Sequence, residues 1–225
     1  MRTLIRTIPA AMLVLALGTT GLLAQAPGNG DFQWYVGGQG GVTFFKTPSQ
    51  GRSGIPTFGG HTLIVAKRTG LMLSFDEAVG SNELSSYTDA GGAQSVTFND
   101  IRRYSAVLMA FPIKAAAQPY LGLGYGLIHV VNPTPSSSAA FQSTANELGS
   151  SGFATFVGGL QFQVGRFMAF GQYQITSSGG QKVATASDGT VVGVGQLLDG
   201  PTHTFTGGLR IGLGSAREDV KAGGY

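Results

Sequence analysis

Residues 203–213 read His203-Thr-Phe-Thr-Gly-Gly-Leu-Arg-Ile-Gly-Leu213, and this stretch decides the fold. Apolar side chains and glycine alternate here with threonine, glycine and Arg210 at a period of two residues. Successive side chains of a β-strand point to opposite faces, so the pattern predicts a strand with one apolar and one polar face. In a soluble sandwich the apolar face would point inward, whereas in a membrane barrel it would face lipid and the polar face would line the interior.

Seven further segments repeat this alternation, and no window beyond residue 31 keeps apolar residues at helical spacing. The segments are 34–44, 58–66, 71–79, 95–111, 119–131, 155–164 and 167–176. Eight tilted strands of about ten residues each suit a minimal bilayer-spanning barrel. The even number is that of single-chain bacterial barrels. The sequence therefore predicts an all-β fold, an eight-stranded antiparallel up-and-down transmembrane β-barrel.

The connections between these segments alternate in length. The long ones are 47–57, 80–94, 132–152 and 177–200, and the short ones are 67–70, 112–118 and 165–166. Outer-membrane barrels have short periplasmic turns and longer extracellular loops. The alternation therefore predicts a barrel whose first strand starts in the periplasm.

The N-terminal segment has the layout of a secretory signal. Arg2 and Arg6 precede an apolar run over residues 8–23, and Ala24-Gln25-Ala26 follows. A membrane-anchoring helix is the alternative, but the run is short and Gly18 and Gly21 weaken its helix. We expect a cleaved signal peptide over residues 1–26, with the cut near 24–26, then a barrel over 27–214 and a short tail over 215–225.

Composition excludes several classes of protein. Charged residues make up only 11% of the chain, and removing Arg2 and Arg6 leaves 12 basic against 11 acidic residues, which is nearly neutral. Basic residues are scattered, so we expect no nucleic-acid partner. Cysteine is absent, which excludes disulfide frameworks and thiolate zinc sites.

Three stretches of the chain resemble the OmpA-like small outer-membrane β-barrels. They are Trp34-Tyr-Val-Gly-Gly38, Pro119-Tyr-Leu-Gly-Leu-Gly-Tyr-Gly126 and His203-Thr-Phe-Thr-Gly-Gly-Leu-Arg-Ile-Gly212. The resemblance implies a monomer in the bacterial outer membrane, with membrane lipid and lipopolysaccharide and the barrel assembly machinery as partners. Members of this group commonly end on an aromatic residue of the last strand, whereas here the charged tail follows Gly214. No peptidoglycan-binding domain is recognised, so cell-wall tethering is not expected.

Histidine offers little sign of catalysis or metal binding. His61, His129 and His203 all fall in or beside predicted strands, and no His-x-x-x-His or His-x-Ser spacing occurs. A lipid A deacylase needs a serine and a histidine near the lipid face, and the nearest candidates would be His203 or His61 with adjacent threonines. We expect a non-enzymatic protein without cofactor, metal or catalytic residues.

Four polar side chains are candidates for the barrel interior, namely Asp76, Arg103, Gln172 and Arg210. They could line a gated pore, but eight strands leave room for little beyond side chains, which favours a plugged interior. We therefore expect a structural or surface-interacting outer-membrane protein. The alternatives are a narrow channel or transporter of small hydrophobic molecules, and a soluble periplasmic lipocalin-like barrel with its apolar faces inward.

Overall fold

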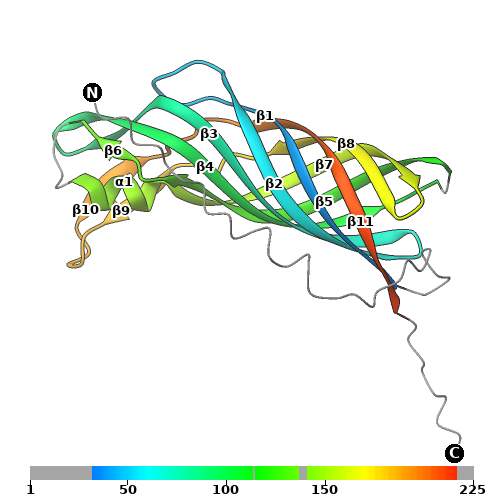
Figure 1. Ribbon diagram of the computed structural model, residues 1–225. Helices are drawn as coiled ribbons and strands as arrows, with labels where there is room; N and C mark the ends of the chain where they lie inside the picture. The colour runs from blue at the N-terminus through cyan, green and yellow to red at the C-terminus, as the bar shows by residue number, and fades with distance from the viewer. Residues whose placement is uncertain (1–31, 114, 137–140, 217–225) are drawn as a thin grey trace, which may run out of the picture.

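The wall of the molecule is a closed β-barrel. The computed structural model describes residues 32–113, 115–136 and 141–216. Eight long antiparallel strands follow one another around the barrel, and β1 pairs with β11 to close it (Figure 1). These strands are β1 (Phe32–Phe45), β2 (Ser53–Ala66), β3 (Thr69–Asp89), β4 (Gly92–Ala110), β5 (Ala117–Val131), β7 (Ser150–Val164), β8 (Phe167–Thr176) and β11 (Thr202–Ala216). The predicted all-β, eight-stranded barrel is confirmed.

The described residues cover most of the predicted barrel but not the predicted signal peptide. The signal peptide expected over residues 1–26 lies outside the described residues, as does the tail from residue 217 onward. β11 extends to Ala216, two residues beyond the predicted end of the barrel. The start of β1 and the end of β11 lie at the same end as the short turns, because Phe32 pairs with Ala216 and also with Ala66.

The faces of the strands follow the predicted alternation. On the outer face Leu108 is 70% exposed and Leu123 67%. On the inner face Tyr120 is 1% exposed and Arg210 is fully buried. A soluble protein would not present such an apolar wall to water, whereas in a bilayer this wall faces lipid.

Outward aromatic residues mark the two rims of the wall. Trp34 and Phe167 lie near the short-turn end, while Phe44 and Phe205 lie near the other end. Ten residues separate Trp34 from Phe44, which corresponds to about 24 Å along the barrel axis for a strand tilted about 45°. This is the height of the apolar band of outer-membrane barrels, which is flanked by aromatic girdles.

The expected long connection at residues 80–94 is wrong, because β3 and β4 continue through it. They remain paired up to Asp89 and Gly92, and a β-bulge interrupts the ladder between Val79 and Glu83. Asn82 takes a positive φ of 54° in this bulge, and its N–H donates to Asn99 Oδ1 at 2.9 Å. The strands therefore extend well beyond the wall, and pairing with each other overrides the low strand propensity of this Gly/Ser/Asn-rich segment.

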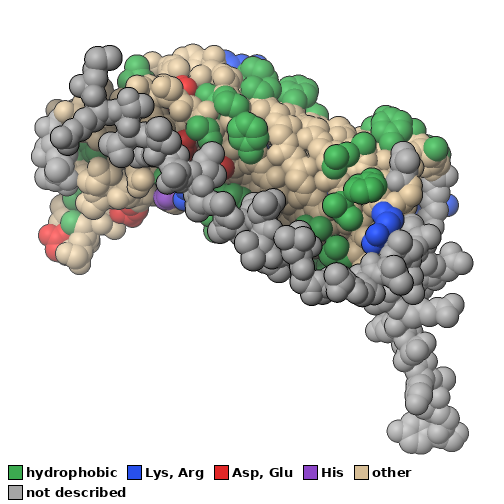
Figure 2. Space-filling view, in the orientation of Figure 1, with side chains coloured by type: hydrophobic (Ala, Val, Ile, Leu, Met, Phe, Trp, Pro, Cys, Tyr) green, Lys and Arg blue, Asp and Glu red, His purple; other side chains and the backbone are tan. Residues whose placement is uncertain are grey.

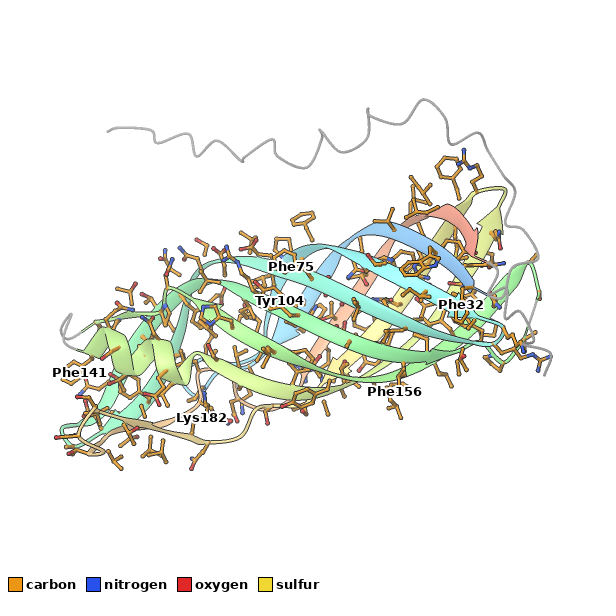
Figure 3. All side chains as sticks on the ribbon, turned by 90° about the horizontal axis from the view of Figure 1, so that it is seen from below. Phe32, Phe75, Tyr104, Phe141, Phe156 and Lys182 are labelled. Carbon is orange, nitrogen blue, oxygen red and sulfur yellow. The ribbon has the colours of Figure 1, made fainter. Side chains whose placement is uncertain are left out.

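The other outer connections also contain regular structure. It consists of β6 (Thr134–Pro135), α1 (Gln142–Leu148), β9 (Lys182–Thr185) and β10 (Val191–Gly195). β6 pairs with β4, and β10 pairs with both β9 and β3. Figure 3 shows Phe141 and Lys182 at this end of the molecule and Phe32 at the opposite end. Within the described residues, no helix is long and apolar enough to cross a membrane.

Apolar side chains fill both ends of the barrel. The cluster at the turn end contains Tyr35, Leu63, Met72, Val107, Met109, Phe111, Tyr120, Val157 and Met168. The cluster at the loop end contains Phe45, Ile55, Tyr87, Val96, Phe98, Ile101, Ile128, Val130, Phe153 and, from the loops, Ala145, Leu148, Ala184, Leu197 and Leu198. Polar side chains occupy the interior between them.

Barrel closure at Gly41 gives the first testable prediction. A Cβ at Gly41 would overlap the carbonyl oxygen of Phe205 on β11, so Gly41→Val should prevent β1 and β11 from pairing. We expect this variant to lose most of the folded band that wild-type protein gives in unboiled samples on a denaturing gel. Gly171→Ala is the control, because nothing lies within 4 Å of a Cβ there. A wild-type folded band for Gly41→Val would contradict this account of closure.

Candidate functional site

The first interior polar cluster joins Asp76 and Arg103. These residues are direct cross-strand partners on β3 and β4, and each is 2% exposed. Arg103 Nη2 lies 3.7 Å from Asp76 Oδ2, and Gln39 Nε2 donates to Asp76 Oδ1. Arg103 Nη1 donates to Thr204 Oγ1 at 2.6 Å. The cluster therefore links β1, β3, β4 and β11 across the lumen.

Threonines extend this cluster around the inner wall. Thr43 Oγ1 and Thr204 Oγ1 are 3.0 Å apart, and Thr57 Oγ1 donates to Thr43 Oγ1 at 2.6 Å. Gly59 makes room for the Asp76 carboxylate, which a Cβ at this position would overlap. A small residue opposite a buried ion pair lets the pair fit a narrow lumen.

The second cluster surrounds Arg210. Its Nε donates to His61 Nε2 at 2.8 Å and its Nη1 to Gln161 Oε1 at 2.6 Å. The guanidinium carbon lies 4.0 Å from the ring centre of Phe170 and 5.6 Å from that of Tyr120. Among the described residues no carboxylate contacts Arg210. Neutral acceptors and aromatic faces therefore surround this buried cation.

Gln172 belongs to the same region as Arg210. Its Oε1 accepts a hydrogen bond from the Tyr120 hydroxyl at 3.1 Å, and that ring also faces Arg210. The structure thus places all four candidates in the interior, with Asp76 and Arg103 as one pair and Gln172 and Arg210 joined through Tyr120. The period-two pattern did not identify Gln39, His61, Gln161 or Tyr120 as their partners.

The three histidines have different surroundings. His61 contacts Arg210 in the lumen, whereas His203 Nδ1 and the Tyr173 hydroxyl are 2.6 Å apart on the outer wall. His129 Nδ1 lies 2.6 Å from Ser150 Oγ, a contact that the sequence did not suggest because 21 residues separate the two. The described residues contain no group of three His, Cys, Asp or Glu side chains able to hold a metal ion.

The His129–Ser150 contact lies in an outward row of polar residues. Strand register places Glu77 beside Arg102, Arg102 beside His129 and His129 beside Ser150. Imidazole and hydroxyl could act as base and nucleophile, but such a pair needs a third group to orient the base. Glu77 is held by Arg102 at 2.8 Å, and no carboxylate among the described residues bonds to His129. The row therefore lacks the geometry of a catalytic triad.

Breaking the Asp76–Arg103 pair should strongly destabilise the barrel. Asp76→Ala leaves a buried guanidinium without its carboxylate, which costs about 3–5 kcal/mol of unfolding free energy. Asp76→Leu combined with Arg103→Met removes both charges and should cost less than Asp76→Ala alone. Urea titration of the refolded barrel, followed by the fluorescence of Trp34, the single tryptophan, measures both. Equal stability of wild type and Asp76→Ala would contradict a structural role for the pair.

Comparisons with known proteins identify the fold. No protein-family model matches the chain, and no curated protein matches it. The crystal structure of Neisserial surface protein A is similar, with a TM-score of 0.50 and 12% identity over 79% of this chain and 96% of that one. The outer membrane protein OprG from Pseudomonas aeruginosa aligns at a TM-score of 0.45 and 13% identity, over 82% of this chain and 98% of that one.

The closed barrel and its apolar outer wall together indicate where in the cell the protein lies. The barrel has a closed backbone, polar clusters in the middle of its lumen and an outward apolar band between two aromatic rims. Figure 2 shows hydrophobic side chains spread over this outer wall. Only a bilayer accommodates such a wall, and closed barrels of this kind cross outer membranes. The chain has the fold of the small eight-stranded outer-membrane β-barrels and is an integral protein of the bacterial outer membrane.

Proposed function

We propose that this barrel is a non-enzymatic structural or surface-interacting protein that presents a folded cap outside the cell and does not conduct solutes. The cap comprises residues 46–52, the outer part of the β3–β4 hairpin, and residues 132–136, 141–149 and 177–201 of the other two connections. The observation that carries the proposal is the apolar cluster at the loop end, because side chains from the wall and from the loops pack together there.

Hydrogen bonds join the first outer connection to the hairpin. Gln50 Nε2 donates to Glu83 Oε2 at 3.0 Å, and the Leu84 N–H donates to Gln50 Oε1 at 2.9 Å. Thr47 Oγ1 donates to the Leu84 carbonyl at 2.5 Å. Side chains of this connection therefore bond to both the backbone and a side chain of the hairpin, and a connection held in this way suits a recognition surface.

The remaining connections fasten to the same hairpin and to each other. Ser85 Oγ donates to the Leu197 carbonyl at 2.8 Å, and Lys46 pairs with Asp199 at 3.1 Å. Lys182 Nζ donates to the Glu147 carbonyl at 3.0 Å, which ties β9 to the end of α1. All four outer connections therefore act as one unit.

The outer surface of the cap has the composition of a contact surface. Leu84, Val183, Val191 and Val194 are between 36% and 55% exposed on it. Acidic side chains gather at the same end of the molecule in Figure 2. Exposed apolar residues with a polar surround are typical of protein-interaction surfaces, which favours a surface-interaction role.

A channel is the less favoured function. Leu63, Phe111, Tyr120, Phe153 and Arg210 lie along the lumen, and each is less than 2% exposed. A conducting path needs a continuous row of hydrated residues, which these packed side chains do not offer. A soluble lipocalin-like binder is disfavoured because its apolar faces would have to point inward.

Planar-bilayer recording tests the proposal against the channel alternative. We expect purified, refolded protein to give no discrete conductance steps above the lipid baseline, because the loop-end and turn-end clusters both fill the lumen. A permeabilising control barrel in the same bilayer shows that insertion occurred. Reproducible unitary steps from the wild-type chain would favour the channel instead.

Packing of the cap gives a separate prediction at Gly193. A Cβ at Gly193 would lie 2.6 Å from Thr144 Cγ2 on α1 and 3.3 Å from the Tyr87 ring, so Gly193→Val should push α1 and β10 apart. We expect faster proteolysis within the cap while the barrel keeps its folded gel band. Gly51→Ala is the control, since nothing lies within 4 Å of its Cβ. Unchanged proteolysis of Gly193→Val would argue against a tightly packed cap.

A further inference from the structure

Two hollows follow each other along the outer face of the β1–β11 seam. The one nearer the cap measures about 400 Å³ and is lined by Phe44, Arg52, Tyr173, His203 and Phe205. The other measures about 560 Å³, and its lining includes Val36, Gly38, Gly40, Gly207 and Leu209. Gly40 pairs with Gly207 and Phe44 pairs with His203, so both hollows overlie the same two strands.

Glycines form the floor of the second hollow, although packing within the barrel does not require glycine at these positions. A Cβ would come no closer than 3.9 Å to another group at Gly38, 3.6 Å at Gly40 and 3.5 Å at Gly207. None of the three has a positive φ. Larger apolar residues would fit here, so glycine serves the outer surface by keeping this strip of wall low. In Figure 2 much of the middle of the wall is tan, with hydrophobic side chains beside it.

The cap end of the seam combines aromatic rings with a cation. The Tyr173 and Phe205 ring centres are 4.9 Å apart, and Phe44 packs edge-on to Phe205 at 6.3 Å. Arg52 is exposed and has no ion-pair or hydrogen-bond partner among the described residues. Asp199 at this rim is already paired with Lys46. An anion at this level would find Arg52 available to it.

We propose that the β1–β11 seam binds one phosphorylated, acylated lipid of the outer leaflet. An acyl chain lies along the glycine floor, and a headgroup phosphate lies against Arg52, within reach of His203. The aromatic rim is at the depth where headgroups meet acyl chains, and the long loops place this rim on the outside of the membrane. The proposal depends on this orientation and not on the surface role of the cap.

A second copy of the chain is the other occupant that a low apolar strip could accept. Two barrels in one membrane are related by an axis along the membrane normal, so a shared seam would place their two Arg52 side chains at the same height and close together. Repulsion between two unpaired guanidinium groups disfavours that arrangement. Charge complementarity therefore favours the anionic lipid.

Native mass spectrometry of the refolded full barrel tests the site, with diphosphorylated lipid A as the probe. We expect one lipid A per barrel and at least a tenfold loss of affinity for Arg52→Ala and for Gly40→Leu combined with Gly207→Leu. The first change removes the phosphate partner, and the second fills the floor. Each variant must first give the folded band on an unboiled gel.

Two control variants separate the seam from general membrane binding. Lys67→Ala removes an exposed cation at the turn end, and Ala106→Leu enlarges an exposed outward side chain on β4, a strand that pairs with β3 and β5 and lies away from the seam. Both should bind lipid A within twofold of wild type. Dephosphorylated lipid A should bind wild type at least tenfold more weakly than diphosphorylated lipid A.

Four results would overturn the proposal. They are wild-type affinity in either seam variant, equal loss in the control variants, binding of dephosphorylated lipid A as tight as that of lipid A, and a dimer that Gly40→Leu with Gly207→Leu dissociates. None of these four results depends on the conductance measurement that tests the proposed function. Failure of the lipid site and failure of the proposed surface role are therefore distinguishable.

Discussion

Backbone hydrogen bonding in lipid is the constraint on which the rest of this structure depends. The bilayer core offers no water to an unpaired N–H or C=O, so a β-sheet crosses it only when its first and last strands pair. Here β1 and β11 pair from Phe44 and His203 to Phe32 and Ala216, with one register shift between Trp34 and Tyr35. Their pairing turns a meander of hairpins into a wall and determines which residues meet lipid and which meet each other.

A barrel of eight strands encloses a narrow lumen, and its contents follow from that size. Inward polar side chains cannot remain hydrated, so they must pair within the protein. Asp76 and Arg103 do so as an ion pair, while Arg210 uses His61, Gln161 and the Phe170 ring. The resulting core stabilises the barrel and leaves little space for a solute path.

The outer connections face water, which can hydrogen-bond an unpaired backbone group. Their structure can therefore depart from that of the regular wall, and the features specific to this barrel lie there. The β3–β4 hairpin rises out of the wall at the Asn82 bulge, and α1 and the β9–β10 hairpin pack against it. The seam below this cap combines Arg52 with a glycine floor at the lipid boundary. Both proposed contact surfaces thus lie at or near the outer rim.

Period-two alternation by itself determined the strands and placed Arg210 and Gln172 on the face opposite the apolar side chains, because side-chain direction in a strand depends only on position along it. The closed barrel decided that this polar face points inward. Contacts such as Asp76 with Arg103 or His129 with Ser150 depend on strand register, and those of Arg210 also on barrel curvature, which bring together residues distant in sequence. Local pattern likewise predicted a loop at residues 80–94, because the strands there are formed only through pairing between β3 and β4. Only the closed tertiary structure supplies such partners, and with them the cap and the seam.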